Sequence, residues 1–367
     1  MNLAVINVGT RTVKAAVVRL TEDGAFSVDR QVIERDDDAL LDAAILAAAR
    51  PLCDHPIDAV AHRIVHGGAQ LDRPIQIDAD VEATLEALSA LAPLHNPPAL
   101  RGVRVLRGLL PSCPAIAVFD TAFHADRPLE SRMYALPWEL TRSLALYRYG
   151  FHGIAHTSLL ESVAAAQQRS PSEVDAVTLQ LGSGCSACAI HAGRSVETSM
   201  GFSPLEGLPM STRSGDIDPA IIFHLARQGW TLEEIEGLLL ERSGLLGLAG
   251  SGDVRDLLEA ESKGDPRAQT ALAIFVHRTV SVVGAYLTLL QGRGCVAFGG
   301  GIGTHSAEIR RRIAEGLTAW NVRLDGERNA RGTPGRISTH DSRDMYVFST
   351  DEESLIARAA AEVLDAR

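Results

Sequence analysis

The feature that most constrains the fold is a pattern of three short apolar strands that occurs twice in the chain. Near the N-terminus LAVINV leads into the loop GTRT, then VKAAVVRL, the turn TEDG and AFSVDRQVI. In mid-chain DAVTLQL leads into GSG, then CSACAI, the turn HAGR and SVETS. Short strands linked through glycine-containing turns form antiparallel hairpins, so each copy predicts three adjacent antiparallel strands. The repetition indicates an internal duplication of one α/β unit.

Helices and further strands are predicted after each copy of this pattern. Helices are predicted over the alanine-rich residues 38–50 and over residues 218–228 and 232–240. Short apolar runs over residues 115–119 and 295–298 predict strands that are covered on both faces. The second run continues into the glycine stretch GGGIG and a helix from about Ser306, in which Ile309, Ile313 and Leu317 have helical spacing. A strand, a glycine loop and a helix start together favour the binding of an anion or a nucleotide.

Composition limits the classes of function. A chain of 367 residues is long enough for two domains. Its net charge of −11 argues against binding to nucleic acid or to an anionic membrane. The five cysteines are an odd number scattered through the chain, which favours a reducing cytoplasm over a disulfide framework. Cys185 and Cys188 lie three apart in a predicted strand and face opposite sides, so we expect packing and not a shared metal.

Two segments bear on the location of the protein. The N-terminus MNLAVINVG lacks a basic region and a long apolar segment, so we expect no signal peptide. The most apolar stretch, residues 270–290, contains His277 and Arg278 near its middle. Charged groups are costly inside a bilayer, so we interpret this stretch as a long buried helix and not as a membrane span. A cytoplasmic location follows as the expectation.

A carboxylate at the end of a buried strand raises a question about function. The apolar run 115–119 ends directly in Asp120. In open α/β sheets ligands bind outside the carboxyl ends of the strands, so Asp120 is a candidate site residue. The alternative is an aspartate that caps the following turn through its own backbone, which is common. The strand by itself leaves both interpretations open.

Five segments concentrate reactive residues, namely AHRIVHGG, LAPLHNPPAL, AVFDTAFH, YRYGFHGIAH and SMGFSPLEGLPMSTRSGDIDP. In this order they resemble the acetate kinase family, within the superfamily of hexokinase, actin and the heat-shock ATPases. The similarity extends from INVGTRTVK to TDEE. It implies a duplicated ribonuclease H-like (actin-like ATPase) α/β fold of two domains with a nucleotide cleft between them. We expect the first domain to comprise residues 1–124 and 353–367, and the second residues 125–352.

The resemblance also implies a reaction. The γ-phosphoryl group of ATP would pass in line and reversibly to acetate, which gives acetyl phosphate and ADP, with Mg²⁺, or Mn²⁺ as an alternative, as the metal. It implies a homodimer, for which the helix 270–290 is a candidate interface. Three alternatives stay open, namely a propionate or butyrate kinase, a related kinase with another phosphoryl donor, and a nucleotide-binding regulator without turnover.

Phosphoryl transfer to a carboxylate brings two anions together, so the protein must position them and neutralise charge. The resemblance assigns the acyl carboxylate to Arg63 and the moving phosphoryl group to Arg213. It implies that His152 donates a hydrogen bond to that group and that His95 lines the same region. Asp120 would orient an arginine and balance charge. The apolar acyl pocket would be formed by Val65, Leu94, Phe151 and Pro204. For the other histidines (His62, His66, His124 and His156) structural and functional roles are equally open.

The nucleotide side is assigned in the same way, by resemblance. Near the first loop Asn7 and Lys14 flank Thr10 and Thr12. Lys14 is assigned to ATP, and Asn7 and Glu352 are assigned to Mg²⁺. The second loop, Gln180, Leu181, Gly182, Ser183 and Gly184, would meet the phosphates. The remaining positions, around adenine and ribose, are Asp253, Val254, Arg255, Gly301, Ile302, Gly303, Thr304 and His305. Mg²⁺ retains most of its waters, so an asparagine and a glutamate that act through water are sufficient.

Four departures from the family pattern fall on this nucleotide side. The loop H-L-G-N-G is QLGSG, with Gln180 and Ser183. The stretch G-I-G-E-N is GIGTH, Arg11 stands in a loop that is usually serine-rich, and T-N-E-E is TDEE through Asp351. The acyl side keeps the family residues. We therefore hypothesise that the reaction is retained while the phosphoryl donor or its affinity differs.

Overall fold

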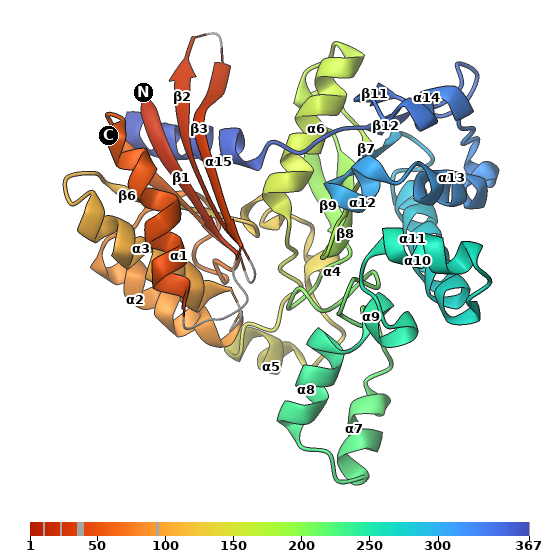
Figure 1. Ribbon diagram of the computed structural model, residues 1–367. Helices are drawn as coiled ribbons and strands as arrows, with labels where there is room; N and C mark the ends of the chain where they lie inside the picture. Colours follow the sequence, from red (N-terminus) through yellow and green to blue (C-terminus); the bar gives the residue numbers. More distant parts are fainter. Residues whose placement is uncertain (10–11, 23, 35–39, 93–94, 367) are drawn as a thin grey trace. The chain divides into compact units, whose positions relative to one another are not determined.

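The computed structural model describes residues 1–9, 12–22, 24–34, 40–92 and 95–366. The chain divides into two compact units. Unit 1 comprises Met1–Ala125 and Asp351–Arg367, and unit 2 comprises Asp126–Thr350. Each unit contains its own six-stranded sheet with helices packed against it (Figure 1).

The sheet of unit 1 has the strand order β3-β2-β1-β4-β6-β5. Its strands are β1 (Asn2–Val8), β2 (Thr12–Thr21), β3 (Gly24–Glu34), β4 (Ala59–Ile64), β5 (Ile75–Gln76) and β6 (Ala115–Phe119). The first three strands pair antiparallel, as the sequence pattern predicts. β4 is parallel to β1, β6 is parallel to β4, and β5 is antiparallel to β6.

The sheet of unit 2 repeats this arrangement in the order β9-β8-β7-β10-β12-β11. Its strands are β7 (Ala176–Leu181), β8 (Cys185–His191), β9 (Arg194–Thr198), β10 (Cys295–Gly299), β11 (Gly335–Arg336) and β12 (Met345–Val347). β7, β8 and β9 pair antiparallel, β10 and β12 continue the sheet in parallel, and β11 is antiparallel to β12. Because order and direction match strand by strand, the expected duplication of one α/β unit is confirmed.

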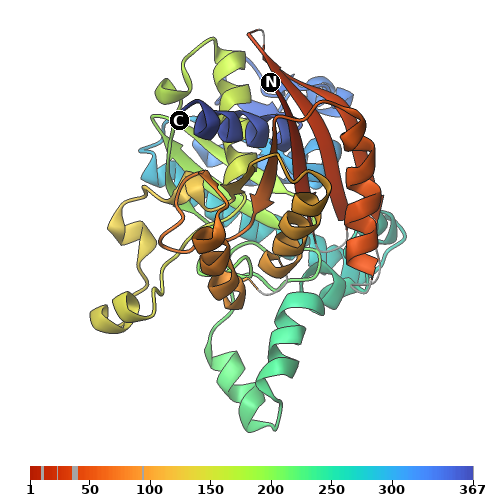
Figure 2. The ribbon, with the colours of Figure 1, turned by 90° about the vertical axis from the view of Figure 1, so that its left-hand side faces the viewer.

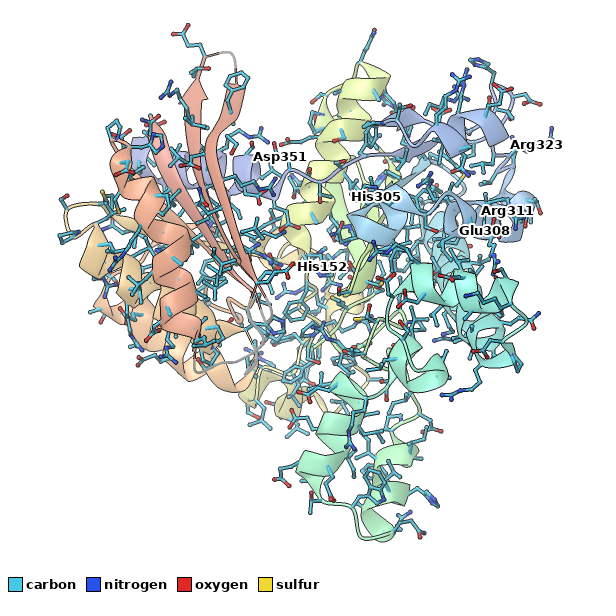
Figure 3. The ribbon with its side chains drawn as sticks, in the orientation of Figure 1. His152, His305, Glu308, Arg311, Arg323 and Asp351 are labelled. Carbon is cyan, nitrogen blue, oxygen red and sulfur yellow. The ribbon has the colours of Figure 1, made fainter. Side chains whose placement is uncertain are left out.

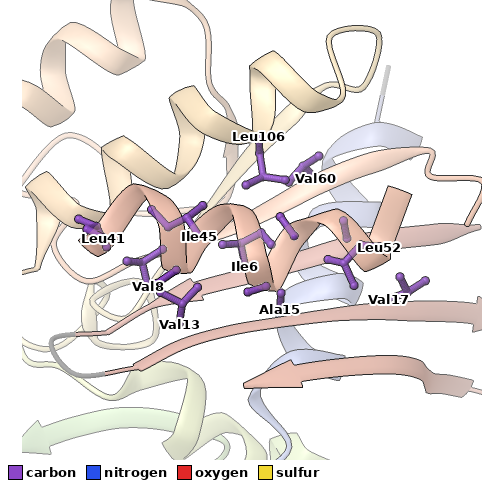
Figure 4. Close-up of a cluster of buried hydrophobic side chains, with 14 residues drawn as sticks. Ile6, Val8, Val13, Ala15, Val17, Leu41, Ile45, Leu52, Val60 and Leu106 are labelled. Atoms are coloured by element: carbon purple, nitrogen blue, oxygen red, sulfur yellow. The ribbon is translucent and has the colours of Figure 1, made fainter. Parts of the chain in front are cut away.

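Unit 1 places its helices on both faces of its sheet. The helices are α1 (Leu41–Ala49), α2 (Ala79–Ala87), α3 (Asn96–Leu109) and α15 (Glu352–Asp365), with the 3-10 turns η2 (Arg50–Asp54), η3 (Leu88–Ala90) and η4 (Ala122–His124). Alternate residues of β1, such as Ile6, pack with Ile45 of α1 and Leu106 of α3 (Figure 4). The intervening residues Leu3 and Val5 are buried on the other face, against which α15 packs.

Unit 2 carries most of the helices of the chain. They are α4 (Leu129–Arg132), α5 (Trp138–Ser143), α6 (Gly153–Gln167), α7 (Ala220–Arg227), α8 (Leu232–Glu241), α9 (Gly244–Ala249), α10 (Val254–Ser262), α11 (Pro266–Leu289), α12 (Gly300–His305), α13 (Ala307–Gly316) and α14 (Gly326–Arg331), with η5 (Pro171–Glu173) and η6 (Thr318–Trp320). α6 packs on β7 and β10, whereas α11 packs on β7 and β8. The two antiparallel helices α7 and α8 extend away from the rest of the unit (Figures 1 and 2).

The helix expected over residues 270–290 forms, but the expectation that it is buried is only half right. α11 buries one stripe, which includes Phe275 and Leu287, while Ile274 and Leu289 are exposed. Apolar side chains occur all around this helix, so the sequence did not reveal that one face meets solvent. By length and composition α11 is also able to span a bilayer. Its buried stripe instead packs against strands and helices of unit 2, as a core helix does.

The glycine stretch after β10 was expected to be a loop, and this prediction is wrong. Helix α12 begins at Gly300, directly after the strand, and includes the remaining glycines. Ser306 then caps α13, with its hydroxyl accepting a hydrogen bond from the backbone N–H of Ile309 at 3.3 Å, so the second helix start is confirmed. Glycine has a poor helix propensity, so tertiary contacts must hold α12 in place.

Candidate active site

In unit 1 three predicted site residues meet at the carboxyl ends of the parallel strands β1, β4 and β6. Arg63 of β4 donates from Nε to Oδ1 of Asp120 at 2.8 Å and from Nη2 to Oδ2 at 2.5 Å. Its Nη1 donates to Oδ1 of Asn7 at 3.1 Å. The carboxyl ends of β4 and β6 are adjacent because the parallel register places Ile64 of β4 opposite Phe119 of β6. The guanidinium is thereby held in one plane at the sheet edge where open α/β folds bind ligands.

This geometry answers the question raised by Asp120. Its side chain is almost fully buried, and both carboxylate oxygens accept hydrogen bonds from Arg63. The following turn η4 has no side-chain cap, so the capping interpretation does not apply. Burial lowers the pKa of Arg63, but the Asp120 carboxylate outweighs burial, and the net shift of the pKa is upward. A paired charge of this kind is tolerated in a buried position.

Lys14 and Glu352 extend this cluster within unit 1. Lys14 of β2 lies directly opposite Asn7 of β1 in the antiparallel register and is half-buried. Glu352 is the first residue of α15, whose N-cap Asp351 accepts a hydrogen bond from the Ser354 backbone at 3.1 Å. Burial, and then the Asp120 carboxylate, raise the pKa of Glu352, against the opposing charges of Arg63 and Lys14. The departure Asp351 therefore has a structural use as a helix cap.

The oxygen atoms of Asn7 and Glu352 are of the type that Mg²⁺ prefers. Oδ1 of Asn7 already accepts a hydrogen bond from Arg63, which leaves one lone pair for a water or a metal. Among the described residues no group of three or more His, Cys, Asp or Glu is arranged to hold a metal ion. These residues therefore fit a metal that is held through its waters and through a bound phosphate, and not one caged by the protein.

The other predicted residues of unit 1 flank this cluster. Val65 directly follows β4 and is buried. His95 is half-buried and precedes α3 as its N-cap residue. Thr12 begins β2, and its carbonyl accepts a hydrogen bond from the Gly9 backbone at 2.8 Å. Thr10, Arg11 and Leu94 lie outside the described residues.

In unit 2 the two glycine-rich segments lie side by side. The loop 182–184 joins β7 to β8, and a Cβ on Gly182 would lie 3.9 Å from the backbone N of Gly301. Gly300 has φ +75°, and a Cβ there would lie 2.4 Å from the carbonyl oxygen of Leu181. Only glycine allows this close approach. The backbone N–H groups at the start of α12 are thus brought beside the phosphate-type loop.

Arg310 fixes the far end of α12. It is almost fully buried and donates from Nη1 to the carbonyls of Gly303 at 2.9 Å and Thr304 at 2.7 Å. Nε donates to Oδ1 of Asn329 and Nη2 to its carbonyl, both at 2.8 Å. Burial lowers the pKa of Arg310. A cation on the last carbonyls satisfies acceptors that a helix leaves open and opposes the helix dipole.

His152 and Arg213 approach the loop 182–184 from two other segments. A Cβ on Gly184 would lie 3.3 Å from Cε1 and 3.4 Å from Nε2 of His152, and 3.6 Å from Nη1 of Arg213. His152 directly precedes α6 (Figure 3). Its backbone is left-handed, with φ 59°. Strained backbone of this kind in a non-glycine residue clusters at functional sites.

Arg213 carries a charge that no carboxylate balances within the described part of the chain. Its Nη1 donates to the carbonyl of Pro204 at 3.1 Å and contacts the sulfur of Met210 at 3.8 Å. Burial lowers the pKa of Arg213, and among the described residues only Cys185 opposes this shift. Burial also raises the pKa of Cys185 to about 12, so its thiol is neutral and does not balance the charge. The planar fork of a guanidinium matches the oxygen atoms of a carboxylate or a phosphate.

The segment around residues 251–255 is linked to the loop 182–184 through Ser211. The Ser211 backbone donates to the Ser183 carbonyl at 3.1 Å, and its hydroxyl donates to the Gly252 carbonyl at 2.9 Å. Asp253 caps α10 and pairs with the exposed Arg255 at 2.6 Å, while Val254 is buried. Unit 2 thus contains the segments 180–184, 253–255 and 301–305 that were predicted to contact the nucleotide, whereas Lys14 and Thr12 lie in unit 1.

The remaining predicted residues of unit 2 differ in accessibility. Phe151 is buried and Pro204 is half-buried beside Arg213. Within α12 Gly303 is buried and Ile302 is half-buried, while the hydroxyl of Thr304 donates to the Phe348 carbonyl at 3.1 Å. His305 ends the helix and is exposed (Figure 3).

The comparisons with known proteins agree with this geometry. The family model described as the acetokinase family matches residues 6–358. The chain belongs to the acetokinase family. It is 38% identical to a protein named acetate kinase from Methanosarcina acetivorans, over 100% of this chain and 97% of the relative. It is 44% identical to another of that name from Leifsonia xyli, over 86% of this chain and 80% of the relative.

Solved structures show the same fold. A propionate kinase from Francisella tularensis superposes with a TM-score of 0.89 at 32% identity, over 99% of both chains. An acetate kinase from Porphyromonas gingivalis superposes with a TM-score of 0.86 at 30% identity, over 99% of both chains. The expected family and fold class are confirmed, and the chain is a kinase of the acetokinase family.

Unit 2 also has a surface cavity of about 600 Å³ apart from the residues that the family pattern assigns. It is lined by α13 and the following segment, including Glu308, Arg311 and Arg323 (Figure 3). Arg311 already pairs with Glu308 at 2.6 Å and with Glu315. Its charge is therefore balanced, unlike that of Arg213.

Sequence reasoning missed the partners that hold the family residues in place. Asn7 was assigned only to a metal, yet it also orients Arg63. Ser211 and Arg310 were not singled out, although they tie the nucleotide-side segments together. The arginine of IRRRI at position 310 falls among the apolar positions of α13, and this placement was the available signal for a buried role.

Proposed function

We propose that this protein transfers the γ-phosphoryl group of ATP to acetate, reversibly, to give acetyl phosphate and ADP. The observation that carries the proposal is the unbalanced guanidinium of Arg213, which lies beside His152 and the glycine loop 182–184. The acetate kinases among the relatives support acetate as the acceptor.

The reaction places a carboxylate against a polyphosphate, so fixed positive charge is the main requirement. In the proposed mechanism Arg63 binds the acyl carboxylate, with Asp120 and Asn7 setting the plane of its guanidinium. Arg213 binds the phosphoryl group in transit, and His152 donates a hydrogen bond to it. A carboxylate acceptor has no proton to lose at neutral pH, so no general base is needed.

A magnesium ion, when bound with ATP, neutralises charge on the phosphates. Asn7 and Glu352 would hold it through its waters, because each supplies an oxygen atom and neither belongs to a metal cage. Lys14, opposite Asn7, would contribute further positive charge on the ATP side.

Propionate is the second candidate acceptor, because one of the similar structures is a propionate kinase. One methylene changes discrimination in an apolar pocket by only about 1–3 kcal/mol, so closely related enzymes differ in this preference. A changed phosphoryl donor is the second open point. Ser183 and Gln180 replace longer or ring-bearing side chains of the family loop, which supports a test with several donors.

The decisive experiment traps the acyl phosphate as a hydroxamate for acetate, propionate and butyrate with ATP, GTP and pyrophosphate. We expect the highest kcat/KM with acetate and a nucleoside triphosphate. Replacement of Arg213 by Ala should lower kcat by about 10²–10³-fold, as the loss of a transition-state donor does. The exposed Arg331, paired with Glu327 at 3.1 Å, gives the control Arg331→Ala, which should keep full activity. Nucleotide binding without acyl phosphate formation in either direction would show a regulator instead.

We further propose that the protein is a cytoplasmic homodimer. Support comes from the α7–α8 pair, which exposes a set of large apolar side chains, namely Ile221, Phe223, Trp230 and Leu232. Exposed apolar clusters of this kind mark protein interfaces. Of the helix first considered for the interface, α11, only Ile274 and Leu289 are exposed large hydrophobic residues. Light scattering on the wild type and on Phe223→Asp with Leu232→Asp tests this, and an unchanged mass for the variant would exclude α7–α8 as the interface.

A further inference from the structure

A line of four hydrogen-bonded side chains runs from His152 into the interior of unit 2. Nδ1 of His152 lies 2.9 Å from Oγ of Ser186. The same Oγ lies 2.8 Å from Nε2 of His156, and Nδ1 of His156 lies 2.8 Å from Oγ1 of Thr178. The side chains of the other three residues, Ser186, His156 and Thr178, are fully buried. Nothing in the proposed reaction uses Ser186, His156 or Thr178 directly.

The fold places these residues together through two regular spacings. His152 and His156 are four residues apart at the start of α6, so their side chains lie on one helix face. In the sheet, Ser186 of β8 lies opposite Gln180 of β7, and Thr178 is two residues before Gln180. Residues two apart on a strand share a face, so Thr178 and Ser186 both point at α6. The line is therefore a consequence of how α6 packs on β7.

His156 and Thr178, at the buried end of the line, determine which atom donates in each hydrogen bond. Burial lowers the pKa of His156 to about 3, with a smaller contribution from His152, so its ring is neutral. A neutral imidazole has one donor nitrogen and one acceptor nitrogen. Thr178 makes no other side-chain hydrogen bond within the described residues. A buried hydroxyl that does not donate is costly, so the Thr178 hydroxyl must donate to Nδ1 of His156.

We propose that Thr178, His156 and Ser186 are positioning residues that hold His152 in the tautomer with its proton on Nε2. Thr178 donates to Nδ1 of His156, Nε2–H of His156 donates to Ser186, and the Ser186 hydroxyl donates to Nδ1 of His152. Each step leaves the next group only one way to point its proton. The tautomer follows from the hydrogen bonds alone, while its value for catalysis rests on the proposed function.

The outer edge of His152 shows why the tautomer matters. Its Cε1–Nε2 edge faces Gly184, where the missing Cβ keeps a space open, and Nη1 of Arg213 borders the same space. An Nε2–H directed there donates to a phosphoryl oxygen, whereas the lone pair of the other tautomer would repel it. We call the line of hydrogen bonds from Thr178 to His152 the relay. The relay fixes the Nε2–H of His152 as a hydrogen-bond donor toward the reacting phosphoryl group.

The tautomer is measured directly by ¹⁵N NMR of the histidine rings in the full-length protein, without any turnover. His152 and His156 are assigned with His152→Gln and His156→Gln. For the wild type at neutral pH we expect both rings to be protonated on Nε2. A wild-type spectrum with the proton of His152 on Nδ1 would overturn the proposal even if no variant folds.

Variants then test whether these residues position His152 or only stabilise the fold. Ser186→Ala should populate the Nδ1–H form of His152, whereas Ser195→Ala, at another buried serine of the same sheet, should not. Thr178→Val keeps the shape but removes the hydroxyl, and Thr178→Ser keeps the hydroxyl. We expect kcat to fall about tenfold in Ser186→Ala, to fall less in Thr178→Val and to recover in Thr178→Ser, with KM for ATP and acetate unchanged.

The two readouts distinguish the possible failures. An inactive wild type with both rings protonated on Nε2 refutes the proposed function and leaves the relay intact. An active enzyme in which Ser186→Ala changes neither kcat nor the tautomer refutes the relay. Variants that lower the melting temperature but keep kcat and the tautomer would likewise show a purely structural network.

Discussion

The backbone of His152 makes a prediction at the scale of a single residue. With φ at 59° it occupies the left-handed region, which costs a non-glycine residue about 1–2 kcal/mol. Gly150, two residues earlier, also has a positive φ of 79°, but as glycine it carries no such cost. We therefore expect His152→Gly to be more stable than His152→Ala by roughly 1 kcal/mol. Both variants should lose activity about 10²-fold or more.

Urea unfolding of the two variants measures this difference. Ala145, with φ at 50°, offers a control outside the proposed machinery. Ala145→Gly should gain stability for the same reason and keep full activity. Equal free energies of unfolding for His152→Gly and His152→Ala would mean that the backbone at this position is not strained.

Gln180 supports a second prediction at the residue scale. Its Oε1 is buried and has no hydrogen-bond partner within the described residues. Such an acceptor costs about 1–3 kcal/mol unless something donates to it. If nucleotide or its bound water is the donor, Gln180→Met should raise the stability of the free protein by about 1 kcal/mol and raise KM for ATP. Thermal unfolding with and without Mg-ATP checks this, and a variant that loses stability in both conditions would contradict it.

The sequence predicted some contacts between single residues and missed others for a physical reason. Asp120 beside an arginine was predictable, because a buried carboxylate needs a cation and the strand end fixes where it lies. The contact between His156 and Thr178 was not, because it depends on which face of α6 meets β7. No local pattern records the packing angle of a helix on a sheet.

At the scale of elements, α12 depends on a side chain that belongs to the next helix. Arg310 binds its last carbonyls, while the glycines at its start lie against Leu181. Arg310→Met removes those hydrogen bonds and leaves the carbonyls and Asn329 without their donor. We expect the protein to lose about 3–5 kcal/mol of stability, as removal of one partner from a buried polar network does. We also expect KM for ATP to rise more than KM for acetate.

The neighbouring Arg311 gives the matched control for this variant. It is exposed on the same helix and pairs only with Glu308 and Glu315. Arg311→Met should change stability by no more than about 1 kcal/mol and should leave both KM values unchanged. If Arg310→Met raised the two KM values equally, a specific role for α12 on the nucleotide side would be wrong.

Helices and strands were predictable where their periodicity was clear. The helical spacing of Ile309, Ile313 and Leu317 predicted α13, and the three antiparallel strands of each repeat formed as expected. GGGIG was not recognised as a helix, because its propensity is poor and Arg310, which stabilises it, follows the stretch in the chain. The exposed side of α11 was missed because apolar residues do not report whether a partner covers them.

At the scale of the whole molecule, the repeated strand pattern predicted the duplication before any residue was assigned a role. Both sheets share one strand order and one set of strand directions. The two copies nevertheless carry different functional side chains. Unit 1 holds Arg63 against Asp120, whereas Arg213 of unit 2 pairs with no carboxylate among the described residues. The duplication therefore explains the scaffold, while the functional difference lies in side chains that the repeat does not share.

Each unit also buries a histidine that must stay neutral, which predicts how the whole protein responds to acid. Burial, and then Arg107, lower the pKa of His62 to about 3, and burial likewise lowers the pKa of His156 to about 3. The unfolded chain titrates near 6.5, so below that pH it binds protons that the folded units exclude. Stability from these groups is complete above about pH 6.5 and is lost as the pH falls towards about 3.

The expected loss at about pH 5 is roughly 2 kcal/mol for each histidine, from 1.36 kcal/mol per pH unit below 6.5. His62→Leu should reduce the difference between the free energies of unfolding at about pH 7.5 and pH 5 by that amount. His224→Gln, at an exposed position, should leave the difference unchanged. If His62→Leu keeps the full acid sensitivity of the wild type, His62 must already be protonated in the folded protein. Nε2 of His62 has no hydrogen-bond partner in the described part of the chain, which argues against a buried charge there.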